Sequence, residues 1–373
     1  RWPPTLPAVG SIAAWQEVVI GAEIGGLRLS EPLVETGDRV TRGQLLARLA
    51  TGTLRAELKA SRAANSAGSS PSSRQPDLAR PSAGACRRAG CRREDRAMTV
   101  PIDSLDALAA RVPDGAFVAL PPDNSLCPVA LVRALIRRGV RDLRLLGVPI
   151  SGFATDLLIG AGAVTSLTTS AVTLGEAGLA PRFTAAIKTG SLHLTDATCP
   201  AVHTALQAAE KGVPFMPLRG MIGTDLLPQR PDWRVIDSPF ADAPDPIVLV
   251  PALVPDLALI HAAMADRFGN VWVGRRRELA TIAHAARATL VTAERIVEGN
   301  LMEDERLAPG VISSLYVSAV AVAERGAAPL GLLDLYPADA AHLDAYAKAA
   351  RTEDGFRAYL AEHVLGPLPK AAE

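Results

Sequence analysis

The sequence is poor in aromatic residues and carries no net charge, and both deficits restrict what it can bind. Phe, Trp and Tyr make up 4% of the 373 residues, which leaves few rings on which nucleic-acid bases could stack. Lys plus Arg and Asp plus Glu are equal at 39 each, so no overall field attracts a polyanion or an anionic membrane. We therefore expect no nucleic-acid partner.

Cysteine and long apolar runs are also scarce. The four cysteines, at positions 86, 91, 127 and 199, form no disulfide framework, and the pair Cys86 and Cys91 has no matching His or Cys pair at zinc spacing. The longest apolar run, residues 246–265, is broken by two prolines and an aspartate, which excludes a transmembrane helix. The sequence predicts no bound metal and no membrane partner. Its 49% hydrophobic content is enough for a full core.

Three segments of unlike composition follow one another. Residues 15–49 read as short alternating strands separated by glycine-containing turns, typical of a small all-β unit. Residues 55–97 are a Ser/Pro/Gly/Arg mixture that cannot bury enough apolar surface to offset its ordering entropy. We predict a partial biotinyl/lipoyl-like β segment over residues 1–54, a disordered linker over 55–97 and a folded domain over 98–373.

The first segment has a resemblance of its own. Residues 34–46, Val-Glu-Thr-Gly-Asp-Arg-Val-Thr-Arg-Gly-Gln-Leu-Leu, make residues 15–49 resemble half of the barrel-sandwich module in periplasmic adaptor subunits of efflux pumps. The long helical hairpin and the further strands of such an adaptor do not follow, so the half-module cannot close its core. The missing parts favour a remnant or fused leader with no present function. A membrane transport adaptor is the alternative function that this segment offers.

From residue 98 onwards, apolar strands alternate with amphipathic helices. A strand at residues 116–120 is followed by a loop and by a helix at 129–138 that ends at Gly139, with Ser125 as its expected N-cap. Further strands are expected at 142–148, 164–170 and 191–195, and further helices at 181–189 and 200–211. Parallel strands need crossovers of about a dozen residues, so this order predicts an α/β fold: a mostly parallel sheet with helices on both faces.

Ligands of such sheets collect at the carboxyl ends of the strands. We therefore expect five loops to converge, at residues 121–125, 149–155, 175–178, 219–225 and 261–270. The residues predicted to face the substrate are Asp123, Asn124, Ser125, Ser151, Gly152, Arg219 and Thr224.

Other polar residues in these loops have two interpretations each. Glu176 is a candidate base, and hydrogen bonding to a neighbouring loop is the alternative. Arg219 could bind a carboxylate or phosphate, or form a structural ion pair with Asp225 or Asp266. Asp266 and the asparagine four residues later are read as turn-stabilising groups, and His261 as a core histidine.

Seven blocks, in a fixed order, carry a further resemblance. They include Gly-Val-Pro-Phe-Met-Pro-Leu-Arg-Gly at 212–220 and Asp-Arg-Phe-Gly-Asn at 266–270, with others at 130–139, 156–162, 178–183, 223–225 and 250–253. Through them residues 98–364 resemble the α-type subunit of class I coenzyme A transferases, the group typified by the α-type chain of glutaconate CoA-transferase.

This resemblance implies a ribose-phosphate isomerase/CoA-transferase type of fold, a CoA thioester as substrate and no permanently bound cofactor. It also implies a cytoplasmic hetero-oligomer in which a β-type partner supplies the nucleophilic glutamate and carries the glutamyl-thioester. The nucleophile is therefore not expected in this chain, and Glu176 is its one candidate for a catalytic residue.

The chain departs from the family at one turn. The Gly-Gly-Phe turn that usually follows the first strand is replaced by Leu120-Pro121-Pro122-Asp123-Asn124. Proline has no N–H, so oxyanion stabilisation would have to come from Asn124, Ser125 or their backbone. The same fold therefore allows two alternative functions. The chain could be a subunit of an acyl-CoA hydrolase, or a catalytically silent scaffold subunit.

Overall fold

The computed structural model describes residues 29–33, 41, 44–45, 47–49, 100–332 and 335–366. The chain divides into two units, Arg1–Ala89 and Gly90–Glu373. In the first, β1 (Leu29–Pro32) and β2 (Ala47–Leu49) pair antiparallel. The rest of the expected β segment and the expected linker at 55–97 lie outside the described residues. No helix in the described ranges combines the length and apolar character that crossing a membrane requires.

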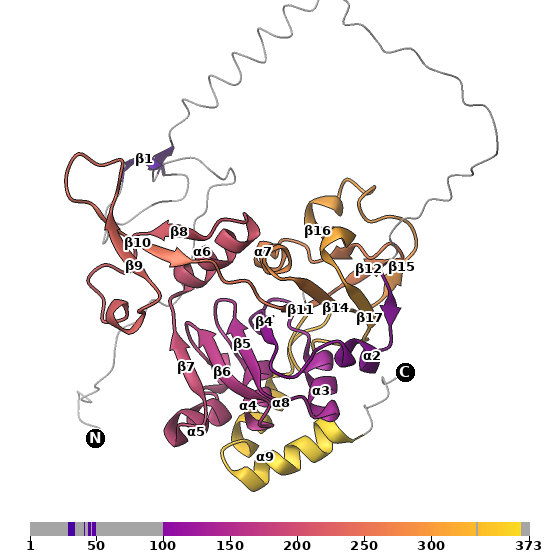
Figure 1. The fold of residues 1–373 in the computed structure, drawn as a ribbon. Coiled ribbons are helices and arrows are strands. Elements are labelled where there is room, and N and C mark those ends of the chain that lie inside the picture. The colour runs from indigo at the N-terminus through magenta and orange to yellow at the C-terminus, as the bar shows by residue number, and fades with distance from the viewer. Residues whose placement is uncertain are drawn as a thin grey trace, which may run out of the picture. The chain divides into compact units, whose positions relative to one another are not determined.

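An eight-stranded sheet forms the centre of the second unit, and all of its strands are parallel (Figure 1). The expectation of a mostly parallel sheet is therefore confirmed. From edge to edge the strands are β3 (Ile102–Asp103), β17 (Ala319–Val322), β14 (Ala288–Ala293), β11 (Leu257–Ala262), β4 (Phe117–Leu120), β5 (Leu143–Gly147), β6 (Val164–Thr169) and β7 (His193–Asp196).

Helices cover both faces of this sheet, as expected (Figure 1). Alternate strand residues point to opposite faces: Val118 joins one apolar core and Ala119 the other. The first core is covered by α2 (Leu105–Ala110), α3 (Val129–Arg138), α4 (Phe153–Gly160), α5 (Pro181–Thr189), α8 (Ala340–Ala349), α9 (Glu353–Leu360) and the π-helical turn Ala361–Leu365. The second is covered by α6 (Cys199–Glu210) and α7 (Arg277–Ala285).

Helix α3 has the predicted bounds but not the predicted N-cap residue. Gly139 closes it in the left-handed region, with φ of 74°, which glycine adopts at little cost. Its N-cap, however, is Pro128, without a side-chain hydrogen bond. The prediction of Ser125 as N-cap is wrong, because the Ser125 hydroxyl instead donates to Glu278 in the first turn of α7.

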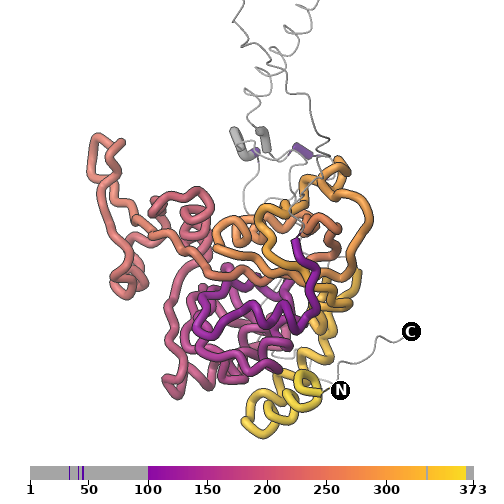
Figure 2. The backbone as a smooth tube through the Cα atoms, turned by 45° about the vertical axis from the view of Figure 1, so that its right-hand side comes forward, coloured from indigo at the N-terminus to yellow at the C-terminus, as the bar shows by residue number. Residues whose placement is uncertain are grey.

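Two smaller sheets were not predicted. The first, β8 (Phe215–Leu218), β10 (Pro246–Pro251) and β9 (Arg234–Asp237), is antiparallel and projects from the body of the unit in two views (Figures 1 and 2). The second runs in the order β15 (Ile296–Val297), β12 (Met264–Asp266), β13 (Val271–Trp272) and β16 (Val311–Ile312). Short 3-10 turns lie at Gly175–Ala177, Leu227–Gln229, Ala308–Gly310 and Ser314–Tyr316.

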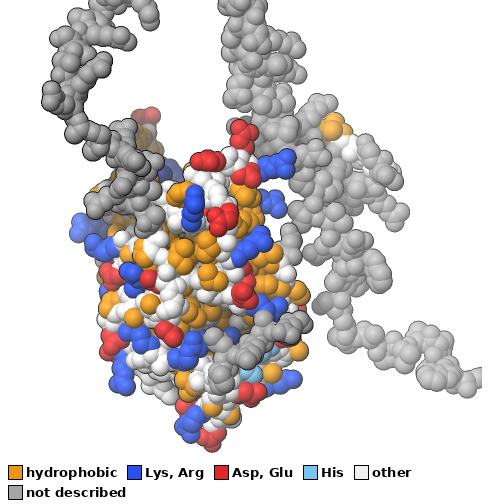
Figure 3. All heavy atoms as spheres, turned by 90° about the vertical axis from the view of Figure 1, so that its right-hand side faces the viewer, with side chains coloured by type: hydrophobic (Ala, Val, Ile, Leu, Met, Phe, Trp, Pro, Cys, Tyr) orange, Lys and Arg blue, Asp and Glu red, His pale blue; other side chains and the backbone are white. Residues whose placement is uncertain are grey.

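Surface charge is mixed in sign. On the face shown in Figure 3, basic and acidic side chains are interspersed around apolar ones over the atoms that are described. This arrangement agrees with the equal numbers of the two signs in the sequence.

Candidate active site

Three loops meet in one cavity of about 460 Å³ at the carboxyl ends of neighbouring strands. Asp123 and Asn124 follow β4, Ser151 and Gly152 follow β5, and Gly175 follows β6. The C-terminal segment closes the opposite side through Leu330, Gly331, Ala338 and Leu343. Three of the five loops expected to converge therefore do so, and the loops at 219–225 and 261–270 contribute no lining residue.

Asp123 is the most perturbed group in this cavity. Its Oδ2 accepts a hydrogen bond from the Phe153 amide at 2.7 Å, while its buried Oδ1 has no partner within the described residues. Burial raises the pKa of Asp123 from 3.8 to about 6. The amides of Phe153 and Ala154 lower the pKa in part, and the Asp156 carboxylate raises it again. A carboxyl group with this pKa exchanges its proton close to neutral pH, as an acid or base in catalysis requires.

Gly152 lets the Asp123 carboxylate approach the start of α4. A Cβ on Gly152 would lie 2.1 Å from Oδ2 of Asp123, which no real side chain tolerates. Gly152 is the N-cap of α4 and has a φ of −146°, so glycine is needed here for space and not for a positive φ. The carboxylate thus takes the place of a capping side chain, at the positive end of the helix dipole.

Two predicted polar residues have structural partners. Buried Ser151 donates to Thr169 Oγ1 at 3.4 Å, and Thr169 donates to the Ala171 carbonyl at 3.0 Å, so the loops after β5 and β6 are tied together. Ser125 uses its hydroxyl on Glu278 and its amide on the Pro122 carbonyl at 2.9 Å. Of the donors proposed to replace the missing glycine turn, Asn124 is the one that lines the cavity.

Arg276 was missed in the sequence and lines the same cavity, at the N-cap of α7. Its Nε is buried and has no hydrogen-bond partner in the described part of the chain. A run of three arginines directly after a strand, at 275–277, is the signal that could have indicated it.

Arg219 and Thr224 lie away from this cavity. Arg219 forms a two-pronged ion pair with Asp245, in which Nη2 and Oδ2 are 2.6 Å apart, and it lines a separate apolar cavity of about 460 Å³ on the projecting sheet. Arg219 thus forms a structural ion pair, as one of its two interpretations expected, although the partner is neither Asp225 nor Asp266. Thr224 donates to the Met221 carbonyl at 2.8 Å.

The remaining candidates are placed as follows. Glu176 is exposed on the 3-10 turn after β6, and only its neighbour Gly175 lines the cavity. His261 is fully buried and contacts Thr292 Oγ1 at 2.8 Å and Glu294 Oε1 at 2.9 Å, so it is a bonded core histidine. Within the ranges described, no cluster of three or more His, Cys, Asp or Glu residues could hold a metal ion.

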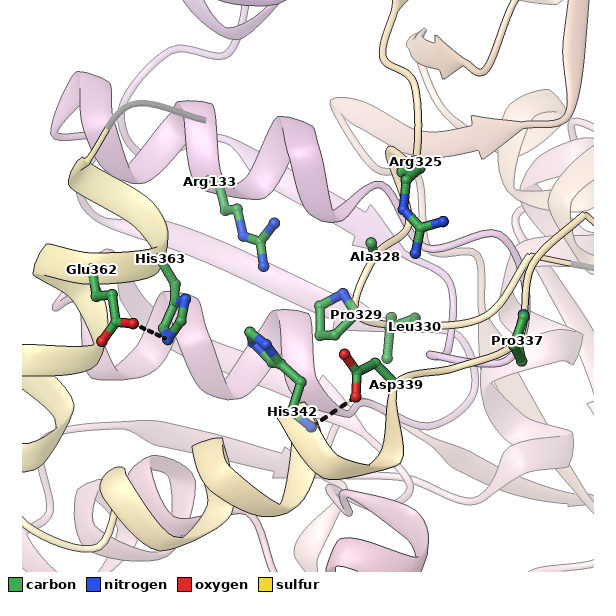
Figure 4. Close-up of a pocket in the computed structure, with 10 residues that line it drawn as sticks. All are labelled: Arg133, Arg325, Ala328, Pro329, Leu330, Pro337, Asp339, His342, Glu362 and His363. Atoms are coloured by element: carbon green, nitrogen blue, oxygen red, sulfur yellow. Dashed lines mark hydrogen bonds and ion pairs between the residues drawn. The ribbon is translucent and has the colours of Figure 1, made fainter. Parts of the chain in front are cut away.

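A second cavity, of about 380 Å³, adjoins the first at Leu330 and is lined by Arg133, Arg325, His342 and His363 (Figure 4). Its histidines are bonded to neighbours: His342 Nε2 lies 2.7 Å from the Tyr359 hydroxyl, and His363 pairs with Glu362 at 3.7 Å. Burial, followed by electrostatic repulsion from His363 and Arg133, lowers the pKa of His342. These contacts fix the C-terminal helices, and we assign them no chemistry.

Comparisons with known proteins agree with this geometry. The family model described as Coenzyme A transferase matches residues 102–316. The α-type chain of glutaconate CoA-transferase from Acidaminococcus fermentans is 32% identical over 69% of this chain and 86% of its own length. A cholesterol ring-cleaving hydrolase IpdA subunit of Rhodococcus jostii is 31% identical over 64% of this chain and 83% of its own. The chain spans 58% of an uncharacterized Archaeoglobus fulgidus protein to which it is 30% identical.

The fold agrees as well. The crystal structure of glutaconate coenzyme A-transferase from A. fermentans superposes with a TM-score of 0.66 at 30% identity, over 71% of this chain and 88% of that one. The matched region of the family model does not include residues 15–49, so the adaptor resemblance gains no support from it. The ordered blocks, the parallel sheet and the α-type relatives lead to one conclusion: the chain belongs to the coenzyme A transferase family, as an α-type subunit.

Proposed function

We propose that this chain, together with a β-type partner subunit, moves coenzyme A between an acyl-CoA and a carboxylic acid. The family membership and the α-type relatives support the activity. The observation that carries the site is the Asp123 carboxyl, which lines a cavity at the carboxyl ends of three parallel strands and has a buried, unpaired oxygen in the described structure. The cytoplasm is the compartment where such thioester chemistry belongs, and it remains a prediction.

The partner's glutamate opens the reaction. Its carboxylate attacks the acyl carbonyl, so a C–O bond forms, the C–S bond breaks and CoA leaves as a thiolate. The thiolate then attacks the glutamyl carbonyl of the acyl-glutamyl anhydride and releases the free acid, which leaves a glutamyl-thioester. Reversal with the second acid completes the exchange, and the energy of the thioester is conserved.

Asp123 acts on the oxygen that becomes negative in these steps. Because burial raises its pKa to about 6, a protonated carboxyl is available near neutral pH and can donate to a developing oxyanion. Asn124 and Arg276, on the same cavity, add a second donor and a positive charge. Together they would replace the backbone donors that Pro121 and Pro122 do not have.

Hydrolysis is the second candidate, and one observation favours it. The ionised form of Asp123 can remove a proton from water beside a thioester. The relative named as a hydrolase subunit is, by its name, ring-cleaving, so it adds no support for hydrolysis of a thioester. The two reactions require opposite forms of the same residue. A catalytically silent scaffold role requires neither form.

The test uses the complex purified with its partner. The substrate acyl-CoA is supplied with and without a panel of carboxylic acids, and products are followed by mass spectrometry. Transfer predicts acceptor-dependent formation of new acyl-CoA and a rate that falls as pH rises above about 6. Hydrolysis predicts free CoA without acceptor and a rate that falls below about pH 6. A complex that produces neither product would overturn both proposals and favour the scaffold.

A further inference from the structure

A third cavity on this unit is lined by three arginines. It has a volume of about 610 Å³, and Arg275, Arg276 and Arg295 share its wall with Trp272 and Met264. None of the described residues that line it is acidic. An arginine is always ionised, so this wall carries three positive charges at neutral pH.

Among the described residues, no ion pair neutralises these charges. The buried Nε of Arg276 also has no hydrogen-bond partner there. Like charges held together in a partly enclosed space repel one another unless an anion joins them. The lining therefore has the chemistry of a site for phosphate or another polyanion.

The backbone holds the arginines in place. Gly310 O accepts from the Val273 amide at 2.9 Å and the Gly274 amide at 3.2 Å, immediately before Arg275. Arg295 is fixed from the other side, because its carbonyl accepts from the Ala265 amide at 3.0 Å. Arg276 is the N-cap of α7, and Arg275 and Arg295 lie in the short turns that follow β13 and β14.

Arg276 connects this cavity with the one that contains Asp123, because it lines both. An acyl-CoA has the same two-ended chemistry: a reacting thioester at one end of a long arm, and three phosphate groups on adenosine at the other. Resting on the proposed function, we infer that the arginine cavity binds the phosphate groups of the CoA substrate while its thioester lies at Asp123. Trp272 and Met264 supply an apolar wall for the adenine.

The test separates the two ends of the ligand. Equilibrium binding of CoA, of pantetheine without phosphates, and of adenosine 3′,5′-bisphosphate is measured on the full chain with its partner. In the double variant Arg275→Gln/Arg295→Gln, CoA and adenosine bisphosphate should bind at least about tenfold more weakly, with pantetheine unchanged. The control is Arg357→Gln, an exposed arginine on α9, which should alter none of the three. Circular dichroism checks that each variant is folded.

Each outcome decides one claim. If the double variant transfers CoA and retains the preference of the unsubstituted complex for CoA over pantetheine, the inference fails and the proposed function stands. If the unsubstituted complex neither transfers nor hydrolyses acyl-CoA, but binds adenosine bisphosphate through these arginines, the phosphate site stands and the proposed function fails. Equal loss of pantetheine binding in the double variant also contradicts the inference, because the effect would then not depend on phosphate.

Discussion

Two aspartates that follow strands of this chain have opposite surroundings. Asp266, at the end of β12, accepts four hydrogen bonds: from the amides of Phe268, Asn270 and Leu301 and from the Asn270 side chain, all between 2.8 and 3.0 Å. Asp123, after β4, has one oxygen bonded to the start of α4 and one oxygen buried without a partner in the described residues. The sequence predicted a loop at both positions, but Asp266 is the last residue of β12.

The difference distinguishes a structural carboxylate from a functional one. A buried carboxylate that accepts its full set of hydrogen bonds stabilises the fold and has nothing left for a ligand. One with an unsatisfied oxygen costs stability, and such a cost is typical of functional groups. If the comparison is correct, the two aspartates should respond oppositely to substitution.

Asp266→Ala should give the largest loss of stability. Four donors would lose their acceptor, and we expect the free energy of unfolding to fall by about 4 kcal/mol. Chemical denaturation of the full chain measures this value. Asp266→Asn, which retains one acceptor oxygen, should lose clearly less. A loss below about 1 kcal/mol in the alanine variant would show that the four hydrogen bonds contribute little to stability. Asp266 could then not be contrasted with Asp123 as a structural carboxylate.

Asp123→Ala should act on rate instead. With transfer as the reaction, removing an oxyanion donor should lower kcat by about 100- to 1000-fold in the complex with the partner. Stability at pH 7 should not fall, because the cost of the buried carboxylate is removed together with its hydrogen bond to α4. Asp123→Asn keeps a donor and should retain activity within about tenfold of the unsubstituted complex for transfer, but not for hydrolysis, which needs a base. Asp106→Ala, an exposed aspartate on α2, is the matched control. Unchanged kcat in Asp123→Ala would remove this residue from the chemistry.

The pH dependence of stability should show the raised pKa directly. Because the pKa of Asp123 is about 6 when folded and 3.8 when unfolded, the folded state retains a proton that the unfolded state releases. Its contribution is complete below about pH 4 and is lost as pH rises through 6, which costs about 3 kcal/mol by pH 7. The stability of Asp123→Asn relative to the unsubstituted protein should therefore increase from pH 4 to pH 7. A difference that is constant with pH would contradict the assigned pKa.

Gly152→Ala tests how closely the carboxylate must approach α4. The new Cβ would have to displace Asp123, and forced packing of this kind costs about 1–3 kcal/mol. We expect lower stability and, because the carboxyl moves, a lower kcat. Gly220→Ala is the control, since a Cβ there has no neighbour within 4 Å. Equal effects of the two substitutions would show that the space beside Asp123 is not what Gly152 provides.

The sequence predicted the local features well and the distant partnerships poorly. Helices α3 and α5 have their predicted bounds, because the glycine after the last residue of each helix and the apolar spacing are signals within a dozen residues. By contrast, the Ser125 hydroxyl donates a hydrogen bond to Glu278, 153 positions further along the chain, and no spacing rule predicts such a pair. The loops after β4, β5 and β6 meet because adjacent parallel strands place them at one edge. Adjacency alone is not sufficient, since β11 also neighbours β4 and yet the stretch 261–270 at its end lines no part of this cavity.

Arg219→Gln should have the smallest effect, although the sequence placed this arginine at the substrate. Its guanidinium and the Asp245 carboxylate form an exposed pair on the projecting sheet, where solvent screens the attraction and the side chains lose entropy on pairing. We expect kcat and KM within about twofold of the unsubstituted complex and no resolvable shift in Tm. Arg276→Gln, on the Asp123 cavity, is the informative counterpart and should raise KM or lower kcat. A strong loss of activity in Arg219→Gln alone would mean that the projecting sheet reaches the reacting groups once the partner is bound. The projecting sheet would then belong to the active site.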